Sequence, residues 1–225
     1  MSSLKNPTDI SLYYFDMPAR AEAIRLALFV GGIEFKDERV NGLQWQAMKS
    51  RFGEYAQIPV LVVDGKVISQ AVNILLYAGT LTGLVPNDLE GELRMREAIL
   101  SCEDLLYTFV QTVSITSADE RAAARAVLMK EGGKSYCQLK RIESLIGEGE
   151  YLVGDSLTVA DLEVYTSGCM MRSGFFDGFG SNCLDAFPKL RSFINRLARH
   201  PKVAEYYKDQ KAAWVVGFRP EEDTA

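Results

Sequence analysis

The chain changes from strand-forming to helix-forming residues within one short stretch, ISLYYFDMPARAEAIR, residues 10–25. Residues 10–15 are rich in the β-branched and aromatic residues that strands favour. Asp16-Met17-Pro18 ends this run, and a proline suits the first turn of a helix. The alanine- and leucine-rich residues 19–30 are expected to be helical until Gly31-Gly32 ends the helix. The stretch therefore predicts a strand followed directly by a helix.

The same alternation continues to about residue 80. Residues 34–40 are expected to form a second strand, and residues 43–49 a short helix. Residues 58–68, IPVLVVDGKVI, contain two β-branched runs joined by Asp64-Gly65, which predicts a hairpin. Residues 70–79 return to helical composition. The predicted order β-α-β-α-β-β-α gives a parallel strand pair with an antiparallel edge, in a small mixed sheet with helices on both faces.

After residue 92 the strand pattern disappears. Helices are expected over residues 92–113, 118–130, 135–146, 160–173 and 188–199. The spacing of Thr158 and Asp161 indicates a capping box at the start of one of them, and residues 82–88 have the composition of a linker. The sequence thus predicts an α/β domain over residues 8–82, a linker over residues 83–91 and an all-helical domain over residues 92–225.

Composition excludes several classes of protein. Hydrophobic residues make up 48% and charged residues 24% of the chain, which is typical of a folded globular protein. The net charge of −5, without a basic cluster, argues against a nucleic-acid partner. The first residues lack the pattern of a signal peptide and no apolar run is long enough to span a bilayer, so we expect a cytoplasmic protein with no membrane partner.

A metal site is not expected either. The cysteines are Cys102, Cys137, Cys169 and Cys183, and none of them forms a C-x-x-C pair. His200 is the only histidine and is given no catalytic role. Reduced thiols in a cytosolic protein are the simpler interpretation.

Residues 12–25, LYYFDMPARAEAIR, resemble the opening of tyrosine-type glutathione S-transferases. In that family a Tyr-Phe pair ends the first strand, and Arg-x-Glu-x-Ile-Arg follows in the first helix. Further segments resemble the family in the same order: Trp45 with Lys49, QIPVL at 57–61 (the family's cis-proline segment), VDG at 63–65 before Ser69-Gln70, and LTVAD at 157–161. The resemblance is closest to the sigma class, which includes the glutathione-dependent prostaglandin D synthases. It implies a thioredoxin-like first domain, an all-α helical-bundle second domain, glutathione as co-substrate and a homodimer.

The chemistry that the resemblance implies is activation of the glutathione thiol. Such a thiol has a pKa near 8.5, so only a few per cent is thiolate at pH 7. A phenol that donates a hydrogen bond to the sulfur stabilises the thiolate and lowers that pKa. Tyr14 is the expected donor because it precedes Phe15 as in the family, and Arg20 is expected to support it. Tyr13 is the alternative, and since adjacent strand residues face opposite sides, only one of the two can reach the sulfur.

The other glutathione contacts are implied by the same resemblance. Trp45 and Lys49 are expected at the glycyl carboxylate, Gln57 and the backbone of Ile58 at the cysteinyl part, and Gln70 at the γ-glutamyl end. Asp104 is expected to reach the γ-glutamyl amino group from the partner subunit. The expected glutathione-binding set is Phe15, Trp45, Lys49, Gln57, Ile58, Pro59, Gln70, Ala71 and Asp104. Structural alternatives are a core anchor for Trp45, a solvated helix residue for Lys49 and a surface ion-pair partner for Asp104.

Ala71 departs from the family pattern, which usually has Ser or Thr at this position to receive the γ-glutamyl carboxylate. Loss of a hydrogen bond to a charged group costs about 1.5–3 kcal/mol. Backbone N–H groups at the start of the third helix can still hold the carboxylate. We therefore expect glutathione binding weaker than the family norm, by about tenfold or more.

The second substrate is expected to be a hydrophobic electrophile bound against an apolar wall between the two halves. Its expected contacts are Met17, Tyr107, Thr108, Gln111, Trp214 and Phe218. Conjugation, isomerisation and peroxide reduction all use the same thiolate, and the sequence does not separate them. The alternative function is a non-catalytic ligand-binding or structural protein on the same fold, which Ala71 motivates.

Overall fold

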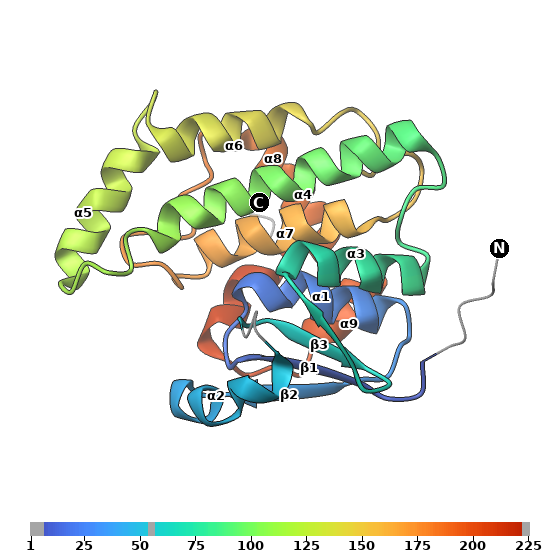
Figure 1. Cartoon of the computed structure of the whole chain (residues 1–225). Helices are drawn as coiled ribbons and strands as arrows, with labels where there is room; N and C mark the ends of the chain where they lie inside the picture. Colours follow the sequence, from blue (N-terminus) through green and yellow to red (C-terminus); the bar gives the residue numbers. More distant parts are fainter. Residues whose placement is uncertain (1–6, 54–56, 222–225) are drawn as a thin grey trace. The chain divides into compact units, whose positions relative to one another are not determined.

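The computed structural model describes residues 7–53 and 57–221, and the chain divides into two units between Val85 and Pro86 (Figure 1). In the described residues, strands occur only in the first unit, and the second unit consists of helices and loops. The predicted α/β half followed by an all-helical half is thereby confirmed.

A four-stranded sheet forms the centre of the first unit, in the order β2-β1-β3-β4. Strand β1 (Ile10–Phe15) is parallel to β2 (Lys36–Val40) and antiparallel to β3 (Val60–Val63), which pairs with β4 (Lys66–Ser69). The β3–β4 hairpin turns through Asp64 and Gly65, with φ angles of 46° and 78°. Positive φ at both central residues is the turn geometry that Asp-Gly favours. The predicted hairpin and mixed sheet are therefore confirmed.

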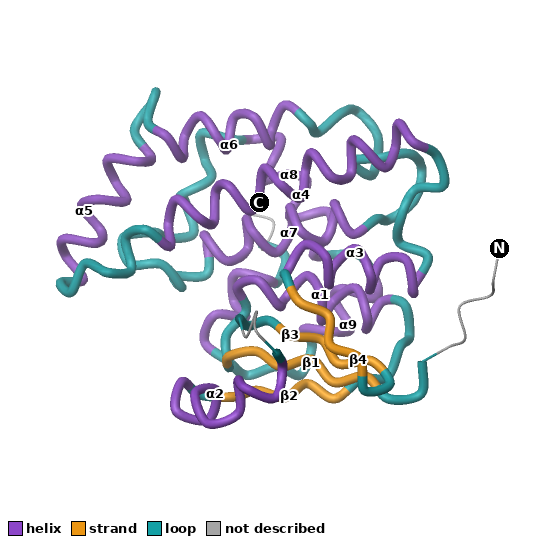
Figure 2. The backbone as a smooth tube through the Cα atoms, viewed as in Figure 1, coloured by secondary structure: helices purple, strands orange, loops and turns teal. Residues whose placement is uncertain are grey.

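Helices cover both faces of this sheet. Figure 2 shows α1 (Ala19–Val30) and α3 (Ala71–Thr82) on one face and α2 (Gly42–Met48) on the other. Helices α1 and α3 pack against each other where α1 ends, at Gly31. A Cβ atom at Gly31 would lie 2.1 Å from the side chain of Thr82, so only glycine fits this contact. The close approach fixes α1, and with it the turn at the end of β1.

Some boundaries in the first unit differ from the predicted ones. Strand β2 begins at Lys36 rather than at residue 34, and α3 runs to Thr82 rather than to residue 79. Helix α2 begins at Gly42 because Asn41 and Gln44 form a capping box, with each side chain accepting a hydrogen bond from the other's backbone N–H (2.9 and 2.8 Å). A 3-10 turn, η1 (Lys49–Phe52), follows it. We did not recognise this capping box in the sequence.

The second unit is a bundle built around one central helix. Its elements are α4 (Leu89–Val110), α5 (Ala118–Met129), α6 (Lys134–Ser144), α7 (Val159–Arg172), α8 (Pro188–Ala198), α9 (Pro201–Tyr207) and the 3-10 turn η2 (Ala213–Phe218). Almost every residue of α7 is buried, and α7 contacts α4, α8 and η2. It starts at the predicted capping box, in which Asp161 accepts hydrogen bonds from the backbone N–H and the hydroxyl of Thr158, both at 2.7 Å.

Helix α4 starts earlier than predicted, and two elements near the C-terminus were not predicted. The side chain of Asp88 caps α4 by accepting from the N–H of Gly91 (2.8 Å), so residues 89–91 are helical although the sequence placed them in a linker. Helix α9 has only 7 residues, too few for a clear helical periodicity. Turn η2 is fixed by Arg172, which donates to the carbonyl oxygens of Gly217 (2.6 Å) and Arg219 (2.9 Å).

Candidate active site

The strand register brings together the ends of three strands that carry candidate residues. Tyr13 pairs with Val60, the first residue of β3, and Tyr14 is the next residue of β1. Val60 pairs in turn with Ser69, the last residue of β4, and Gln70 follows it. Because these pairs are antiparallel, the end of β1, the start of β3 and the end of β4 share one edge of the sheet.

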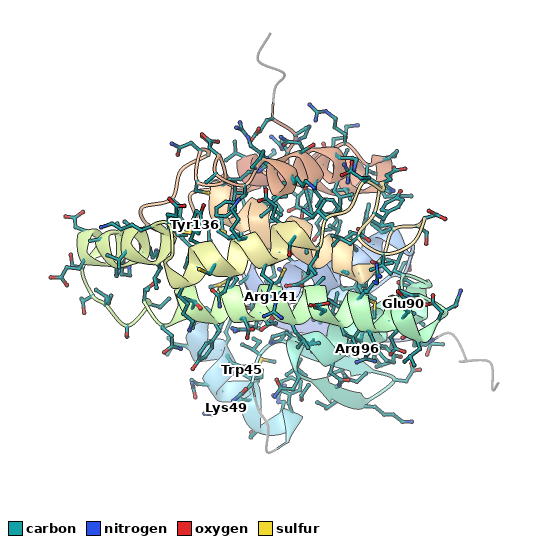
Figure 3. All side chains as sticks on the ribbon, turned by 90° about the horizontal axis from the view of Figure 1, so that it is seen from above. Trp45, Lys49, Glu90, Arg96, Tyr136 and Arg141 are labelled. Atoms are coloured by element: carbon teal, nitrogen blue, oxygen red, sulfur yellow. The ribbon has the colours of Figure 1, made fainter. Side chains whose placement is uncertain are left out.

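Strand β2 delivers two more candidates to this edge. It runs parallel to β1, with Phe15 paired to Val40, so both strands end there and α2 follows at once. Trp45 lies on α2, and Lys49 begins η1 four residues later. Figure 3 shows both side chains on this segment. All the described glutathione candidates of the first unit therefore lie in segments that meet at one edge of the sheet.

The two adjacent tyrosines lie in different environments. Tyr13 packs against the ring of Phe52 at 4.9 Å, in the cluster on the α2 side of the sheet. Tyr14 is 5% exposed and faces α1, where the guanidinium of Arg25 lies 5.8 Å from its ring centroid. The structure thus separates the two tyrosines, as the alternation of strand residues requires.

Three of the candidates belong to that cluster. Trp45 is 6% exposed and stacks on Phe52 with ring centroids 5.5 Å apart, and Phe15 and Ile58 pack against the pair. The ring of Trp45 therefore packs within this cluster. Lys49 is exposed, so its ammonium is accessible to an anionic ligand.

Two backbone features mark the segments around Pro59 and Gln70. The Ile58–Pro59 peptide bond is cis. Gln70 has a φ of 74° and a ψ of 120°, a strained conformation for a residue with a side chain, and α3 begins directly after it at Ala71. Gln57 and Gln70 are exposed, Ile58 and Ala71 are half-buried, and Pro59 is buried. Strained backbone that persists is often found at binding sites.

Arginines hold the turn between β1 and α1. Arg20, on the first turn of α1, is half-buried, and Arg25, one and a half turns further on, is fully buried. Arg25 contacts the turn itself, and Arg39 of β2 pairs with Asp16 at 2.8 Å. Partial burial lowers the pKa of Arg39, but hydrogen bonds to Asp16 and Asp37 outweigh it and raise the pKa above its usual value.

Sequence reasoning missed the role of these charged residues. Arg25 was part of the recognised motif but had no assigned role, and Asp37 and Arg39 lie in a strand that looked merely polar. The available signal was their spacing, since residues two apart in a strand share a face.

In the second unit, α4 carries an exposed set of candidates. Asp104 and Gln111 are exposed, and Tyr107 is 57% exposed. Thr108 is 4% exposed, and its hydroxyl lies 2.9 Å from the carbonyl oxygen of Asp104, to which it donates, and 3.2 Å from Oε1 of Gln138. Thr108 thus belongs to the packing of α4 against α6, and its role as a substrate contact stays a prediction.

Phe218, the other buried candidate for the second substrate, also lies in the core. It is 1% exposed and packs against Tyr207 (5.1 Å) and Trp214 (5.1 Å), while its carbonyl oxygen accepts a hydrogen bond from the hydroxyl of Tyr165. An apolar tail residue is as suited to a core as to a pocket, and here it completes the core. Trp214 and, in the first unit, Met17 are half-buried.

A cavity of about 340 Å³ lies elsewhere in the second unit, between α5, α6 and residues 178–187. Its walls include Tyr136, labelled in Figure 3, and Phe187. None of the candidate residues lines it.

The cysteines are free thiols within the described chain, and Cys137 is exposed. Burial raises the pKa of Cys169 and of Cys183 to about 12, so both stay protonated at neutral pH. Within residues 7–53 and 57–221, the structure contains no cluster of His, Cys, Asp or Glu suited to a metal ion. None of the helices in that part is both long and apolar enough to span a membrane.

Comparison with known families agrees with both units. The glutathione S-transferase N-terminal domain model matches residues 10–80, and the C-terminal domain model of the same family matches residues 103–210. The chain is 32% identical to glutathione S-transferase 3 of Caenorhabditis elegans over 201 residues, which cover 87% of this chain and 93% of the relative. It is 26% identical to the hematopoietic prostaglandin D synthase of Gallus gallus over 196 residues, 87% of this chain and 93% of the relative.

A solved structure has the same fold. Rat hPGDS complexed with a quinoline matches with a TM-score of 0.79 and 21% identity, over 91% of this chain and 98% of the rat chain. The first unit is accordingly a thioredoxin-like domain and the second the helical domain that accompanies it. With both family models matched in order and a relative above 30% identity along most of its length, this chain belongs to the glutathione S-transferase family and is a glutathione transferase.

Proposed function

We propose that Tyr14 activates the thiol of glutathione for addition to hydrophobic electrophiles. The observation that supports the proposal is the strand register: Tyr13 pairs with Val60 and Val60 with Ser69, so the adjoining residues Tyr14, Pro59 and Gln70 belong to strand ends at one edge of the sheet. A tyrosine with a pKa near 10 stays protonated at neutral pH and can donate to a thiolate. Each unit by which the thiol pKa falls gives roughly tenfold more thiolate, until the site is mostly ionised.

The neighbouring segments supply groups that suit a tripeptide. Lys49 and the indole N–H of Trp45 hold the glycyl carboxylate, and Gln57 with the backbone of Ile58 meets the cysteinyl part. Gln70 and the first N–H groups of α3, which starts at Ala71 with no side-chain cap, receive the γ-glutamyl end. An extended peptide docking beside a strand end uses main-chain hydrogen bonds of this kind. Phe15 and Pro59 pack beneath the ligand, and Arg20 supports Tyr14.

The proposed second substrate is a hydrophobic electrophile, and its proposed contacts are Met17, Tyr107, Gln111 and Trp214. These side chains are exposed or half-buried. In a substitution, the thiolate forms a carbon–sulfur bond while the carbon–leaving-group bond breaks and the leaving group departs with its electron pair. In a conjugate addition, the carbon–carbon π bond breaks and the adjacent carbon takes up a proton from solvent. The proton lost from the thiol goes to solvent in both cases. The same thiolate serves isomerisation or peroxide reduction, as expected for a sigma-class protein.

We further propose that the protein is a cytoplasmic homodimer with a role in detoxification. Leu93, Leu100 and Tyr107, each seven residues apart, form an apolar stripe on one face of α4 and are 54–58% exposed. Asp104 is four residues after Leu100 and lies on the same face. A second copy seated on this stripe would receive Asp104 beside its γ-glutamyl subsite, which completes the site across a two-fold axis.

The test is turnover of a model aromatic electrophile by wild type, Tyr14→Phe and Tyr13→Phe. Loss of a hydrogen bond to a charged sulfur costs about 1.5–3 kcal/mol, so we expect kcat/KM to fall about 10- to 100-fold in Tyr14→Phe. Tyr13→Phe is the matched control, since Tyr13 lies on the opposite face, and it should stay within about twofold of wild type. The reverse pattern would assign the role to Tyr13.

Ala71 keeps one alternative open, a non-catalytic ligand-binding or structural role on the same fold. This alternative predicts glutathione binding without turnover of any electrophile and without thiolate formation. The alternative would be established if calorimetry shows that the wild-type protein binds glutathione while the protein neither turns over an electrophile nor forms the thiolate.

A further inference from the structure

The three residues after Tyr14 are each held by an arginine. Arg25 donates from Nη2 to the carbonyl oxygen of Phe15 (3.3 Å) and from Nη1 to that of Met17 (2.8 Å). Arg39 donates from Nη1 to the carboxylate of Asp16 (2.8 Å). Arginine hydrogen bonds therefore hold the turn between β1 and α1 at two backbone carbonyl oxygens, those of Phe15 and Met17, and at the carboxylate of Asp16 between them.

Asp37 joins the two arginines. Its Oδ1 accepts from Nε of Arg25 (3.0 Å), and its Oδ2 accepts from Nε of Arg39 (2.8 Å). The strand register places it for this task, because Asp37 pairs with Leu12 and Arg39 with Tyr14. Glu22 completes the arrangement with an ion pair to Arg25 at 3.1 Å.

We propose that the Arg25–Asp37–Arg39 bridge is a positioning device that holds the turn after Tyr14 in the geometry required for thiol activation. The inference rests on the proposed function of Tyr14. It assigns Asp37 and Arg39, which belong to β2 rather than to the recognised motif, a role in the reaction without contact with the substrates.

The burial of these groups supports a rigid device. The side chains of Arg25 and Glu22 are 0% exposed, and those of Asp37 and Arg39 are 25% and 30% exposed. A guanidinium donates from fixed directions, so several acceptors around one arginine define a geometry rather than only a charge. The turn needs such support, because Ala19 has a φ of 38°, which is strained for any residue other than glycine.

Charge and geometry make opposite predictions for the removal of Asp37. Two arginines (Arg25 and Arg39) and three carboxylates (Asp16, Glu22 and Asp37) leave one net negative charge in the arrangement. Asp37→Asn removes that charge, so an effect of charge alone would favour the thiolate and lower the thiol pKa. It also turns an amide NH₂ toward one of the arginines, which breaks the bridge. A positioning role therefore predicts a higher thiol pKa.

The experiment compares wild type, Asp37→Asn and Lys36→Gln. Lys36 lies on the same strand as Asp37 and forms an ion pair with Asp9 at 2.9 Å. Both side chains of that pair are more than half exposed, so Lys36→Gln is the matched control. We expect Asp37→Asn to raise the pKa of bound glutathione and to lower kcat about tenfold or more, with the glutathione Kd within about threefold of wild type. Lys36→Gln should leave all three unchanged. An unchanged or lowered thiol pKa in Asp37→Asn would overturn the proposal.

A second readout separates failure of this inference from failure of the proposed function. Backbone hydrogen exchange over residues 14–20 should be faster in Asp37→Asn than in wild type or Lys36→Gln, with or without glutathione. If wild type forms no thiolate, the proposed function fails. Equal hydrogen exchange in wild type, Asp37→Asn and Lys36→Gln would instead show that the bridge does not hold the turn. Arg39→Gln, which releases Asp16 but leaves Arg25 paired, gives the same two readouts should Asp37→Asn not fold.

Discussion

Each unit contains an aspartate that joins two arginines. In the first unit Asp37 joins Arg25 and Arg39, and in the second Asp177 accepts from Nε of Arg121 (2.7 Å) and from Nη1 of Arg125 (3.1 Å). One arginine of each pair is buried, with its side chain 0% exposed at Arg25 and 3% at Arg125. The chemistry of the two arrangements is therefore nearly the same.

They differ in what they hold. The Asp37 arrangement grips the turn after Tyr14, beside the candidate site. In the other, Arg121 donates to the carbonyl oxygen of Ile115 (2.6 Å) and Arg125 to the hydroxyl of Thr112 (2.9 Å), so loops of the helical unit are joined. None of the candidate residues takes part there. The comparison shows that stability measurements alone do not separate a positioning device from a structural one.

The largest expected effect is on stability, and it should differ between the two buried arginines. Arg25→Met removes the buried guanidinium that pairs with Glu22, whose side chain is 0% exposed, and breaking such a pair costs about 3–5 kcal/mol. Arg125→Met should cost less, about 1–3 kcal/mol, because Asp177 is 40% exposed and keeps Arg121. Urea unfolding measures both.

An equal fall in the free energy of unfolding in Arg25→Met and Arg125→Met would contradict the argument that burial of the acidic partner sets the cost. Arg25→Lys keeps the charge but loses the planar group, so it should recover part of the stability and little of the turnover.

The next effect concerns ligand binding at the start of α3. Helices α4 and α5 begin at the capping side chains of Asp88 and Ser117, whereas α3 begins at Ala71 with no side-chain cap. A hydroxyl at this position should bind the γ-glutamyl carboxylate, so Ala71→Ser is expected to tighten glutathione binding about tenfold or more. Calorimetry tests this, and an unchanged Kd would show that Ala71 does not limit affinity.

A smaller effect sharpens the comparison of the two turns. The turn after Tyr14 and the turn after Asp177 each contain a residue with positive φ. In the first it is Ala19 (φ 38°), and in the second it is Gly178 (φ 82°). Ala19→Gly should stabilise the first unit, or cost nothing, within about 1 kcal/mol. Gly178→Ala should destabilise by about 1–3 kcal/mol, since its Cβ would lie 2.8 Å from that of Ala122. Thermal unfolding of both variants decides, and a stabilising Gly178→Ala would refute the argument.

The smallest expected effect is the pH dependence at Asp177. The hydrogen bond from Arg121 and the charges of both arginines hold the pKa of Asp177 below its usual value. A lowered folded-state pKa gives stability that is present above the unfolded pKa, near pH 4, and is lost as pH falls through the folded pKa. The gap in unfolding free energy between wild type and Asp177→Asn should therefore be constant from pH 5 to 7 and shrink below about pH 4. A gap that widens on acidification would contradict the lowered pKa.

Much of the fold could be predicted from the sequence because local chemistry agrees with the tertiary structure. The Asp64-Gly65 turn and the β-branched runs around it define the hairpin. Strand β2 was harder to predict, since four of its five residues, Lys36 to Arg39, are charged and show no apolar alternation. Helix α9 is too short for a periodic pattern, and its ends are set by tertiary packing.

Candidate-site residues could be predicted from the sequence only where they belong to a recognisable motif. The segments of Tyr14, Pro59 and Gln70 meet at one edge through pairing that the strand order implies. The burial of Thr108 and Phe218 depends on packing within the helical unit, which a residue's type does not reveal. The bridging role of Asp37 depends on a register that only the folded strand pair defines.

The most direct test of the central claim is an ultraviolet difference titration of the purified protein with glutathione at neutral pH, in wild type and Tyr14→Phe. The account predicts a saturable thiolate band in wild type, with a midpoint pH below the ordinary thiol pKa of about 8.5. It predicts that the band is lost or shifted to higher pH in Tyr14→Phe, while glutathione still binds. A band of equal size and midpoint in both proteins would contradict the assignment of thiol activation to Tyr14.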